Sequence, residues 1–387
     1  MALRTGNGID VREVHAVTTI EFPVRFGIIG AGGISRHHLT AFRERPDIAQ
    51  LVAVADTDLG RAEDLASRAP NGTAVFDDYR RLLELTNVDA VIIALPHFLH
   101  AQVGIDAIQA GLPALIEKPL TCTLDETRRL RDLSIERNVP VVAGQMRRFN
   151  REAVWLQRAI TQKPENFGEL RSFTIHSWQN LLAYLYGVLG LPNGSDHWLL
   201  DGKRAGGGVV ISLACHQVDL LRFLTGLDVR RVVAHGRFDA PFYNGAESTA
   251  SVLIEMENGA SGVLHANYLT SRTPHHEALY LFGEHGMAAQ HAEMVGQYHG
   301  AFIFGSGAAS DATSWNDQYA GIQRVPAEEM IDLHEDPFVE QLSSFARALV
   351  SGSPPMNRIQ ENFNTMAALQ AITDSLNSGE PVVVARE

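Results

Sequence analysis

The 387-residue chain has few cysteines, no cluster of positive charge and no long apolar run. Two cysteines, Cys122 and Cys215, cannot build a disulfide framework, and this usage is typical of the reducing cytoplasm. The formal net charge is −13 without any run of lysine and arginine, which argues against nucleic acid or an anionic membrane surface as a partner. The longest apolar stretch, 181–191, contains two glycines and is too short to span a bilayer.

Residues 1–20 also lack the uninterrupted apolar segment of a secretory signal. What the chain does have is ordinary globular composition, with 45% hydrophobic and 20% charged residues. Its length predicts two domains, each able to bury a core. We therefore expect a tail at 1–23, a nucleotide-binding domain at 24–147, and a substrate-binding and oligomerisation domain at 148–387.

The most informative segment is an apolar strand, 25–29, that ends in a glycine-rich turn, Gly30–Ser35. Gly30 permits a tight turn, and Gly32 lets backbone N–H groups approach a pyrophosphate at the start of a helix. Asp56 follows the next apolar strand and supplies acceptors for the ribose hydroxyls of an adenosine. The pattern predicts a dinucleotide site that prefers NAD to NADP.

Short apolar strands alternate with helical segments from 24 to 145, as in a doubly wound parallel sheet. The clearest helix, 124–137, places Leu124, Thr127, Leu130 and Ile135 on one side. After 229 the strands follow one another without helices, which predicts an open, mostly antiparallel sheet. The fold class is therefore α/β, with an N-terminal Rossmann domain and a C-terminal α/β domain. Expected strands are 25–29, 51–55, 73–76, 90–95, 114–117, 139–143, 170–177, 229–238, 247–256, 261–269, 278–282, 287–289 and 382–384, and other expected helices are 152–160, 209–225, 337–350 and 360–376.

Four motifs in this order resemble the glucose–fructose oxidoreductase, inositol dehydrogenase and MocA (Gfo/Idh/MocA) family over about residues 24–384. The resemblance implies a nicotinamide-dependent oxidoreductase that acts on sugars, polyols or related carbonyls. The motifs are Gly30-Ala31-Gly32-Gly33-Ile34, the strand from Asp89 to Pro96 with His100, Glu117-Lys118-Pro119, and Gly206-Gly207-Gly208 leading to His216 and Asp219.

Lys118 follows an expected strand, and strand ends of an open α/β sheet face the ligand crevice. Pro119 holds the Lys118 backbone extended and so fixes where its ammonium projects. The family resemblance implies that this lysine contacts the cofactor and the reacting hydroxyl, and that it stabilises negative charge on that oxygen. His216 matches the family histidine that takes the hydroxyl proton, a role suited to a group with an unperturbed pKa near ~6.5.

Ser212, His216 and Asp219 share one face of a helix because they are spaced by four and three residues. Ser212 departs from the aspartate that many sugar and inositol dehydrogenases of the family carry at this position. Serine hydrogen-bonds a hydroxyl but supplies no carboxylate, which weakens the inference of a Lys–Asp–His triad and of inositol as substrate. Asp219 is expected either to hold the helix and orient His216 or to contact substrate.

The remaining candidates are weaker. Arg148 either contacts ligand or forms a structural ion pair, and the irregular insertion at 178–205 either binds a sugar or packs. The candidate cofactor contacts are Gly30, Gly32, Gly33, Ile34, Asp56, Leu95, Pro96, His97, His100, Glu117 and Lys118, and the candidate substrate contacts are Ser212, Asp219, Arg148, His197 and Trp198. No metal is expected, because the histidines at 275, 276, 285, 291 and 299 lack metal-site spacing.

Three functions follow from these residues. The first is NAD-dependent oxidation of a secondary alcohol on a sugar, cyclitol or sugar acid, or the reverse reduction. The second is a hydrolase or lyase that keeps its NAD and uses transient oxidation. The third is a nucleotide-binding sensor without catalysis. The open sheet must also be covered, which predicts a homodimer or homotetramer.

Overall fold

A computed structural model describes residues 20–70, 72–162, 167–188, 196–268, 275–294, 297–304, 322–324 and 333–386, with the backbone alone from 291 to 324. The chain divides into two compact units. The first runs to Met146 and also includes Phe338–Phe363, and the second comprises Arg147–Pro337 and the chain from Asn364 onward. By these contacts, residues 338–363 group with the first unit, whereas the expected boundaries place them in the domain 148–387.

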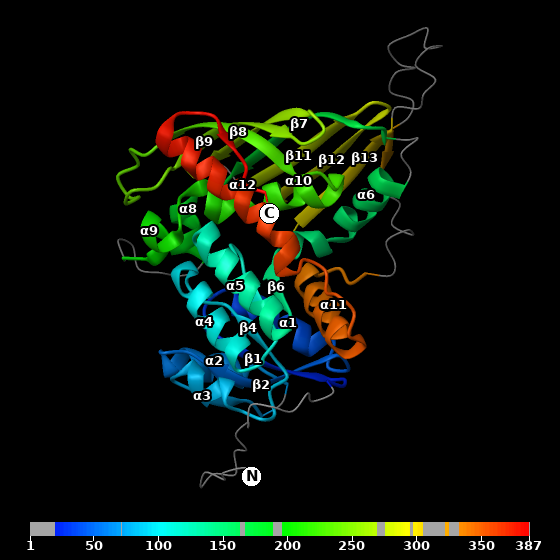
Figure 1. Ribbon diagram of the computed structural model, residues 1–387. Helices are drawn as coiled ribbons and strands as arrows, with labels where there is room; N and C mark the ends of the chain where they lie inside the picture. The colour runs from blue at the N-terminus through cyan, green and yellow to red at the C-terminus, as the bar shows by residue number, and fades with distance from the viewer. Residues whose placement is uncertain are drawn as a thin grey trace. The chain divides into compact units, whose positions relative to one another are not determined.

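In its described part, the first unit contains a six-stranded parallel sheet with the order β3-β2-β1-β4-β5-β6 (Figure 1). This confirms the expected Rossmann sheet. The strand order reverses between β1 and β4, and open α/β sheets bind their ligands beside such a switch point. The strands are β1 Val24–Ile29, β2 Ala49–Ala55, β3 Ala74–Phe76, β4 Ala90–Ile93, β5 Ala114–Glu117 and β6 Val141–Gly144.

Helix α5 illustrates how local sequence sets the helices of this unit. It spans Leu124–Arg137, as predicted, because a capping box between Thr123 and Glu126 starts it and Asn138 ends it with φ 53°. Ile135 is 57% exposed, so its predicted place on the buried face was wrong, and Ser134 lies there instead. Ser134 follows Leu130 by four residues and donates to the Val139 carbonyl, which satisfies its buried hydroxyl. The other helices are α1 Ser35–Glu44, α2 Leu59–Ser67, α3 Tyr79–Leu83 and α4 His97–Gln109.

Two helices from the end of the chain contribute to this unit. Helix α11, Pro337–Ser351, buries Phe345 in the same apolar cluster as Phe26 and Phe42 of β1 and α1. The Phe26 and Phe345 rings lie 6.2 Å apart between centroids. Helix α12, Ile359–Ser378, begins in the first unit and ends in the second. The core of the Rossmann unit is thus completed by residues more than 300 positions after its first strand.

Within the described ranges, the second unit forms a nine-stranded sheet with the order β14-β13-β12-β11-β7-β10-β9-β8-β15, in which only β7 and β10 are parallel neighbours. This confirms the mostly antiparallel sheet, although β13 and β14 were not expected. The strands are β7 Leu170–Trp178, β8 Val229–Arg237, β9 Thr249–Met256, β10 Ser261–Asn267, β11 His276–Gly283, β12 Gly286–Met294, β13 Gln297–Phe304, β14 Ile322–Arg324 and β15 Val382–Val383.

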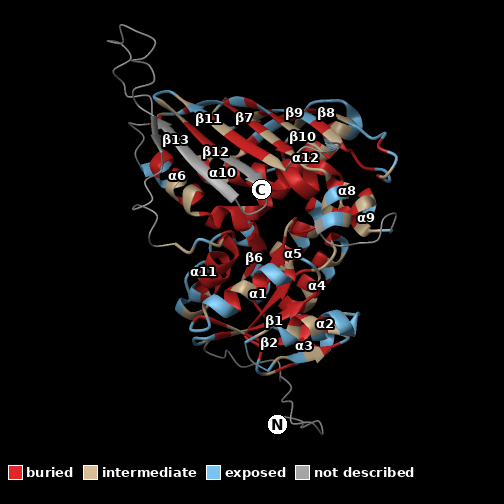
Figure 2. Cartoon of the chain, turned by 180° about the vertical axis from the view of Figure 1, so that it is seen from behind, coloured by how far each residue is buried: buried red, intermediate tan, exposed pale blue. Residues whose placement is uncertain are grey.

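One face of this sheet is covered by α6, Arg151–Gln162, and α10, Cys215–Thr225 (Figures 1 and 2). The residues of β9 and β10 alternate between that buried face and an open face. Leu253 and Val263, paired across these strands, are 53% and 46% exposed on the open face. Among the described helices, the stretch Gly202–Thr225 is apolar and long enough to cross a membrane, but 83% of its 18-residue apolar window is buried inside the fold.

Candidate cofactor and catalytic sites

The glycine turn after β1 has the shape that a pyrophosphate requires. Gly30 adopts φ +98°, and a Cβ there would lie 2.4 Å from the Ala94 carbonyl oxygen, so the position excludes any side chain. A Cβ at Gly32 would meet nothing within 4 Å, which leaves open space beside the start of α1. No side chain caps this helix at Ile34. Uncapped N–H groups beside open space suit the pyrophosphate of a dinucleotide.

Two side chains brace this turn. Ser35, at the third glycine position of the fingerprint, is buried and donates to the Gly30 carbonyl. At the end of β2, Asp56 accepts the Ala31 N–H at 2.7 Å through Oδ2 and the Asp58 N–H at 2.8 Å through Oδ1. These bonds fix the carboxylate beside the glycine turn, and each oxygen retains a lone pair for a further donor.

The chain leaving β4 lies beside the turn, because Leu95 Cδ2 would be 3.0 Å from a Cβ at Gly30. Pro96 precedes α4, whose first residue, His97, is 6% exposed. His100 is fully buried, with its Nδ1 2.8 Å from the Pro119 carbonyl oxygen and its Nε2 2.8 Å from the Leu95 carbonyl oxygen. Both ring nitrogens of His100 therefore contact backbone carbonyls. These contacts do not support the expected direct contact of His100 with the cofactor.

Glu117 and Lys118 follow β5, the strand beside β4. Glu117 is buried, and its Oε1 lies 2.7 Å from Nε2 of His38, a fully buried residue of α1. Its Oε2 accepts the Lys118 N–H at 3.2 Å. Burial raises the pKa of the Glu117 carboxyl, but the hydrogen bond with His38 and nearby positive charge lower it by more, leaving it below its usual range. Lys118 itself is half-buried and is joined to Pro119 by a cis peptide bond.

Gly208, the last of the three consecutive glycines in the second unit, lies directly against Glu247. This buried carboxylate accepts the N–H groups of Gly208 and Val210, each at 2.9 Å. A Cβ at Gly208 would lie 1.9 Å from the Glu247 carbonyl oxygen, so only glycine fits. Burial raises the pKa of the Glu247 carboxyl above its usual range, against the effect of its backbone donors. No motif in the sequence marks Glu247, which lies just before β9 rather than within the expected strand 247–256.

Ser212 and His216 lie on the helical segment that Glu247 caps. The expected helix 209–225 is divided into a π-helical stretch, Val210–Ala214, and α10. Ser212 is 4% and His216 8% exposed. Burial and, after it, the Glu247 carboxylate raise the pKa of the Tyr243 phenol, and a hydrogen bond with the Ser212 hydroxyl lowers it by less. Single π turns inside helices are frequent at functional sites.

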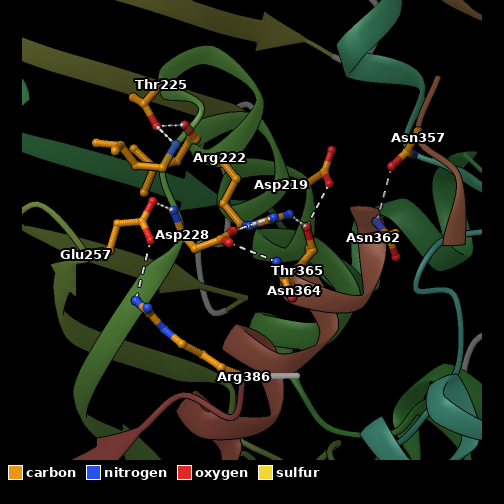
Figure 3. Close-up of polar contacts among 12 residues, drawn as sticks. Asp219, Arg222, Thr225, Asp228, Glu257, Asn357, Asn362, Asn364, Thr365 and Arg386 are labelled. Atoms are coloured by element: carbon orange, nitrogen blue, oxygen red, sulfur yellow. Dashed lines mark hydrogen bonds and ion pairs between the residues drawn. The ribbon is translucent and has the colours of Figure 1, made fainter. Parts of the chain in front are cut away.

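Asp219 holds α10 in place through an extended polar network. Arg148 donates to its two oxygens at 2.6 and 2.7 Å. Thr365 of α12 donates to Oδ1 at 2.9 Å (Figure 3). Arg222 donates to Thr365 at 2.7 Å and to Asp228, so the same network reaches the end of α10. Both Arg148 and Asp219 are buried. Of the two roles considered for each, the geometry supports the structural one.

The other candidates lie apart from these contacts. His197 accepts the Leu199 N–H through Nδ1 at 3.3 Å, and its ring is 5.3 Å from that of Trp198. His275 pairs with Glu277 at 3.0 Å, and His276 stacks on Trp178. In the part of the chain that the structure describes, no three His, Cys, Asp or Glu side chains gather to hold a metal. The side chains of His291 and His299 lie outside the described set.

Comparison with family models identifies both units. Residues 24–145 match the model of the GFO/IDH/MocA oxidoreductase family with an NAD-binding Rossmann fold. Residues 161–289 match the GFO/IDH/MocA C-terminal domain. The chain belongs to the Gfo/Idh/MocA family. The NAD-binding fold of this family agrees with the glycine turn and Asp56 described above.

Several relatives align along most of the chain. D-xylose 1-dehydrogenase (NADP(+)) 2 of Haloferax volcanii is 26% identical over 92% of this chain and 98% of its own length. scyllo-Inositol 2-dehydrogenase (NAD(+)) of Bacillus subtilis is 26% identical over 94% and 97%. The crystal structure of the WlbA dehydrogenase from Bordetella pertussis with NADH and UDP-GlcNAcA has a TM-score of 0.78 and 23% identity over 95% of this chain and 99% of that chain. Its likeness is evidence for the Gfo/Idh/MocA fold.

Proposed function

We propose that the protein is an NAD-dependent dehydrogenase of the cytoplasm that oxidises a secondary alcohol of a sugar, cyclitol or sugar acid, or reduces the corresponding carbonyl. The observation that carries the proposal is the pair of features at the strand ends of one sheet. There the open glycine turn follows β1, and Lys118 follows β5, with its backbone N–H donating to the buried Glu117 carboxylate. Dehydrogenases among the relatives act on such hydroxyl groups.

Each proposed role belongs to a side chain whose chemistry fits it. NAD, when bound by the glycine turn and Asp56, supplies the hydride acceptor. The Lys118 ammonium stabilises the negative charge that develops on the substrate oxygen as the hydroxyl proton leaves. The His216 imidazole accepts the hydroxyl proton as general base. Ser212 donates or accepts one hydrogen bond with a substrate hydroxyl, in place of the carboxylate of many family members.

A substrate screen tests this proposal. The full chain is incubated with NAD and a panel that includes D-xylose, myo-inositol, scyllo-inositol and sugar acids, and NADH is followed by its absorbance. We expect net NADH formation with at least one member. Turnover of a glycoside without net NADH would favour the NAD-retaining hydrolase or lyase. NAD binding with no turnover of any compound would favour the sensor.

Asp56 is expected to select NAD over NADP. Its carboxylate, fixed by Ala31 and Asp58, would repel a 2′-phosphate, and Thr57 rather than an arginine follows it. The double variant Asp56→Ala/Thr57→Arg should raise the affinity for NADP and lower that for NAD in fluorescence titrations. Asp47→Ala, which removes an exposed carboxylate elsewhere in the first unit, serves as control. Tighter binding of NADP than NAD by the unmodified chain would contradict the assignment.

We also propose that the open face of the second-unit sheet associates with a second copy of the chain. Leu253 and Val263 pair across β9 and β10 on this face with about half of each side chain exposed. Light scattering with gel filtration should report at least a dimer at micromolar concentration, and Leu253→Lys/Val263→Lys should shift it to monomer. Ile135→Lys, a charge on an exposed apolar residue of α5, should leave the assembly unchanged. A monomer of the unmodified chain would refute this proposal.

A further inference from the structure

Lys118 lies between two buried histidines that hold the main chain on either side of it. On the side of β5, His38 bonds Glu117 at 2.7 Å, and the other oxygen of Glu117 accepts the N–H of Lys118 itself. The contacts thus run from a helix that begins at the glycine turn, through one carboxylate, to the lysine backbone. All the groups in this path belong to the first unit.

His100 holds the other side. Its two ring nitrogens lie 2.8 Å from the carbonyl oxygens of Pro119 and Leu95. A neutral imidazole donates to one of these carbonyls, and a protonated ring donates to both. In either state the buried ring contacts both the chain just after Lys118 and the chain just after β4, next to the glycine turn, and donates a hydrogen bond to at least one of them.

The surroundings leave Glu117 little room to move. A Cβ at Gly144 of β6 would lie 2.9 Å from the Glu117 Cα and 3.1 Å from its Cδ, so the neighbouring strand packs directly against this residue. The His38 ring meets the Phe338 ring edge-on at 5.3 Å. Breaking one contact of a buried ionised group leaves the partner desolvated and unpaired, which drives the backbone to rearrange.

We propose that His38, Glu117 and His100 are positioning residues that fix the backbone of Lys118 and thereby the place of its ammonium group. The proposal rests on the catalytic role proposed above for Lys118. A displacement of about 1 Å at a reacting group costs as much as ~10²-fold in rate, so the loss of one anchor is enough to be measured.

A double-mutant cycle separates positioning from general stability. His38→Leu removes the partner of Glu117, whereas His38→Gln keeps a donor at that place. We expect His38→Leu to lower kcat by up to ~10²-fold with KM and the NADH dissociation constant little changed, and His38→Gln to recover most of that loss. In a Lys118→Ala background, His38→Leu should have no further effect on kcat. Ser134→Ala, which also removes a buried hydrogen bond in this unit, should leave kcat unchanged.

An equal loss of kcat from His38→Leu in both backgrounds would overturn the proposal, because the histidine would then act without Lys118. Normal turnover by Lys118→Ala would instead overturn the proposed function. A second measurement would then decide whether His38, Glu117 and His100 position Lys118. If His38→Leu does not fold, as judged by thermal unfolding, His100→Leu replaces it with the same expected results.

The second measurement needs no substrate. The sequence contains only three lysines, Lys118, Lys163 and Lys203. Lys203 is exposed on the short helix α9, Gly202–Ala205, and provides an internal reference. Under limited reductive methylation read by peptide mass spectrometry, His38→Leu should raise the labelling of half-buried Lys118 relative to Lys203, and His38→Gln and Ser134→Ala should not. An unchanged ratio in folded His38→Leu would contradict the proposal.

Discussion

Lys118→Ala is expected to lower kcat by at least ~10²–10⁴-fold, the range typical of losing one catalytic group. The substrate oxygen gains negative charge as its proton passes to His216, before the hydride leaves the carbon, and the ammonium is the positive charge proposed to stabilise it. Stabilisation that is present only in the transition state affects kcat rather than binding, so KM and the affinity for NADH should change little. The measurement is initial-rate kinetics with whichever sugar or cyclitol the screen identifies.

Arg129→Ala is the control, because it removes a positive charge from an exposed position on α5 that belongs to no candidate site. It should leave kcat within experimental error of the unmodified chain. Near-normal turnover by Lys118→Ala would eliminate the proposed dehydrogenase mechanism. A fall in NADH affinity equal to the fall in kcat would show instead that the lysine serves the cofactor.

His216→Ala is the second large effect that we expect, a loss of ~10²–10⁴-fold in kcat. Removing the base should also abolish the acid limb of the pH profile, since that limb reports protonation of the group that accepts the hydroxyl proton. Ser212→Ala removes one neutral hydrogen bond four residues earlier, worth ~0.5–1.5 kcal/mol, and should cost only about 2–10-fold. Ser212 and His216 lie on the same buried helical segment, so the two variants compare different side-chain chemistry at similar burial.

The order of these effects is the test. Ser212→Ala as damaging as His216→Ala would mean that this segment works by another chemistry, with serine rather than histidine at its centre. Ser212→Asp restores the carboxylate common in the family and should favour polyols that offer more hydroxyl groups. An unchanged pH profile in His216→Ala would mean that a residue other than His216 is the general base.

Structural features that are determined mainly by one short segment were predictable from the sequence. The glycine turn was predictable because φ +98° and contact with the Ala94 carbonyl both require Gly30. Helix α5 was predictable because Thr123 and Glu126 form its start. Ile135 was misplaced because the apolar residue and the buried position differ by one, and a serine with a local carbonyl partner fills the buried one.

Contacts between distant segments were not predictable from one sequence. Glu247 is separated from Gly208 by 39 positions and lies in no motif, although it explains why that glycine is needed. The pairing of His38 with Glu117 spans 79 positions in the same way. His38 was visible only as part of a helical pattern, and its buried contact with Glu117 needed the fold to bring α1 against β5.

The return of α11 to the first unit has a consequence for how the chain is made. Val339, Leu342 and Phe345 belong to the same core cluster as Phe26, so the Rossmann unit cannot close its core when its own strands leave the ribosome. Residues 147–337 come first, and at ~5–20 residues per second their synthesis takes roughly 10–40 s. During that interval β1 has no Phe345 to pack against. The unit whose strands are synthesised first is therefore completed only near the end of translation, and the apolar surface that α11 covers has no such cover throughout that interval.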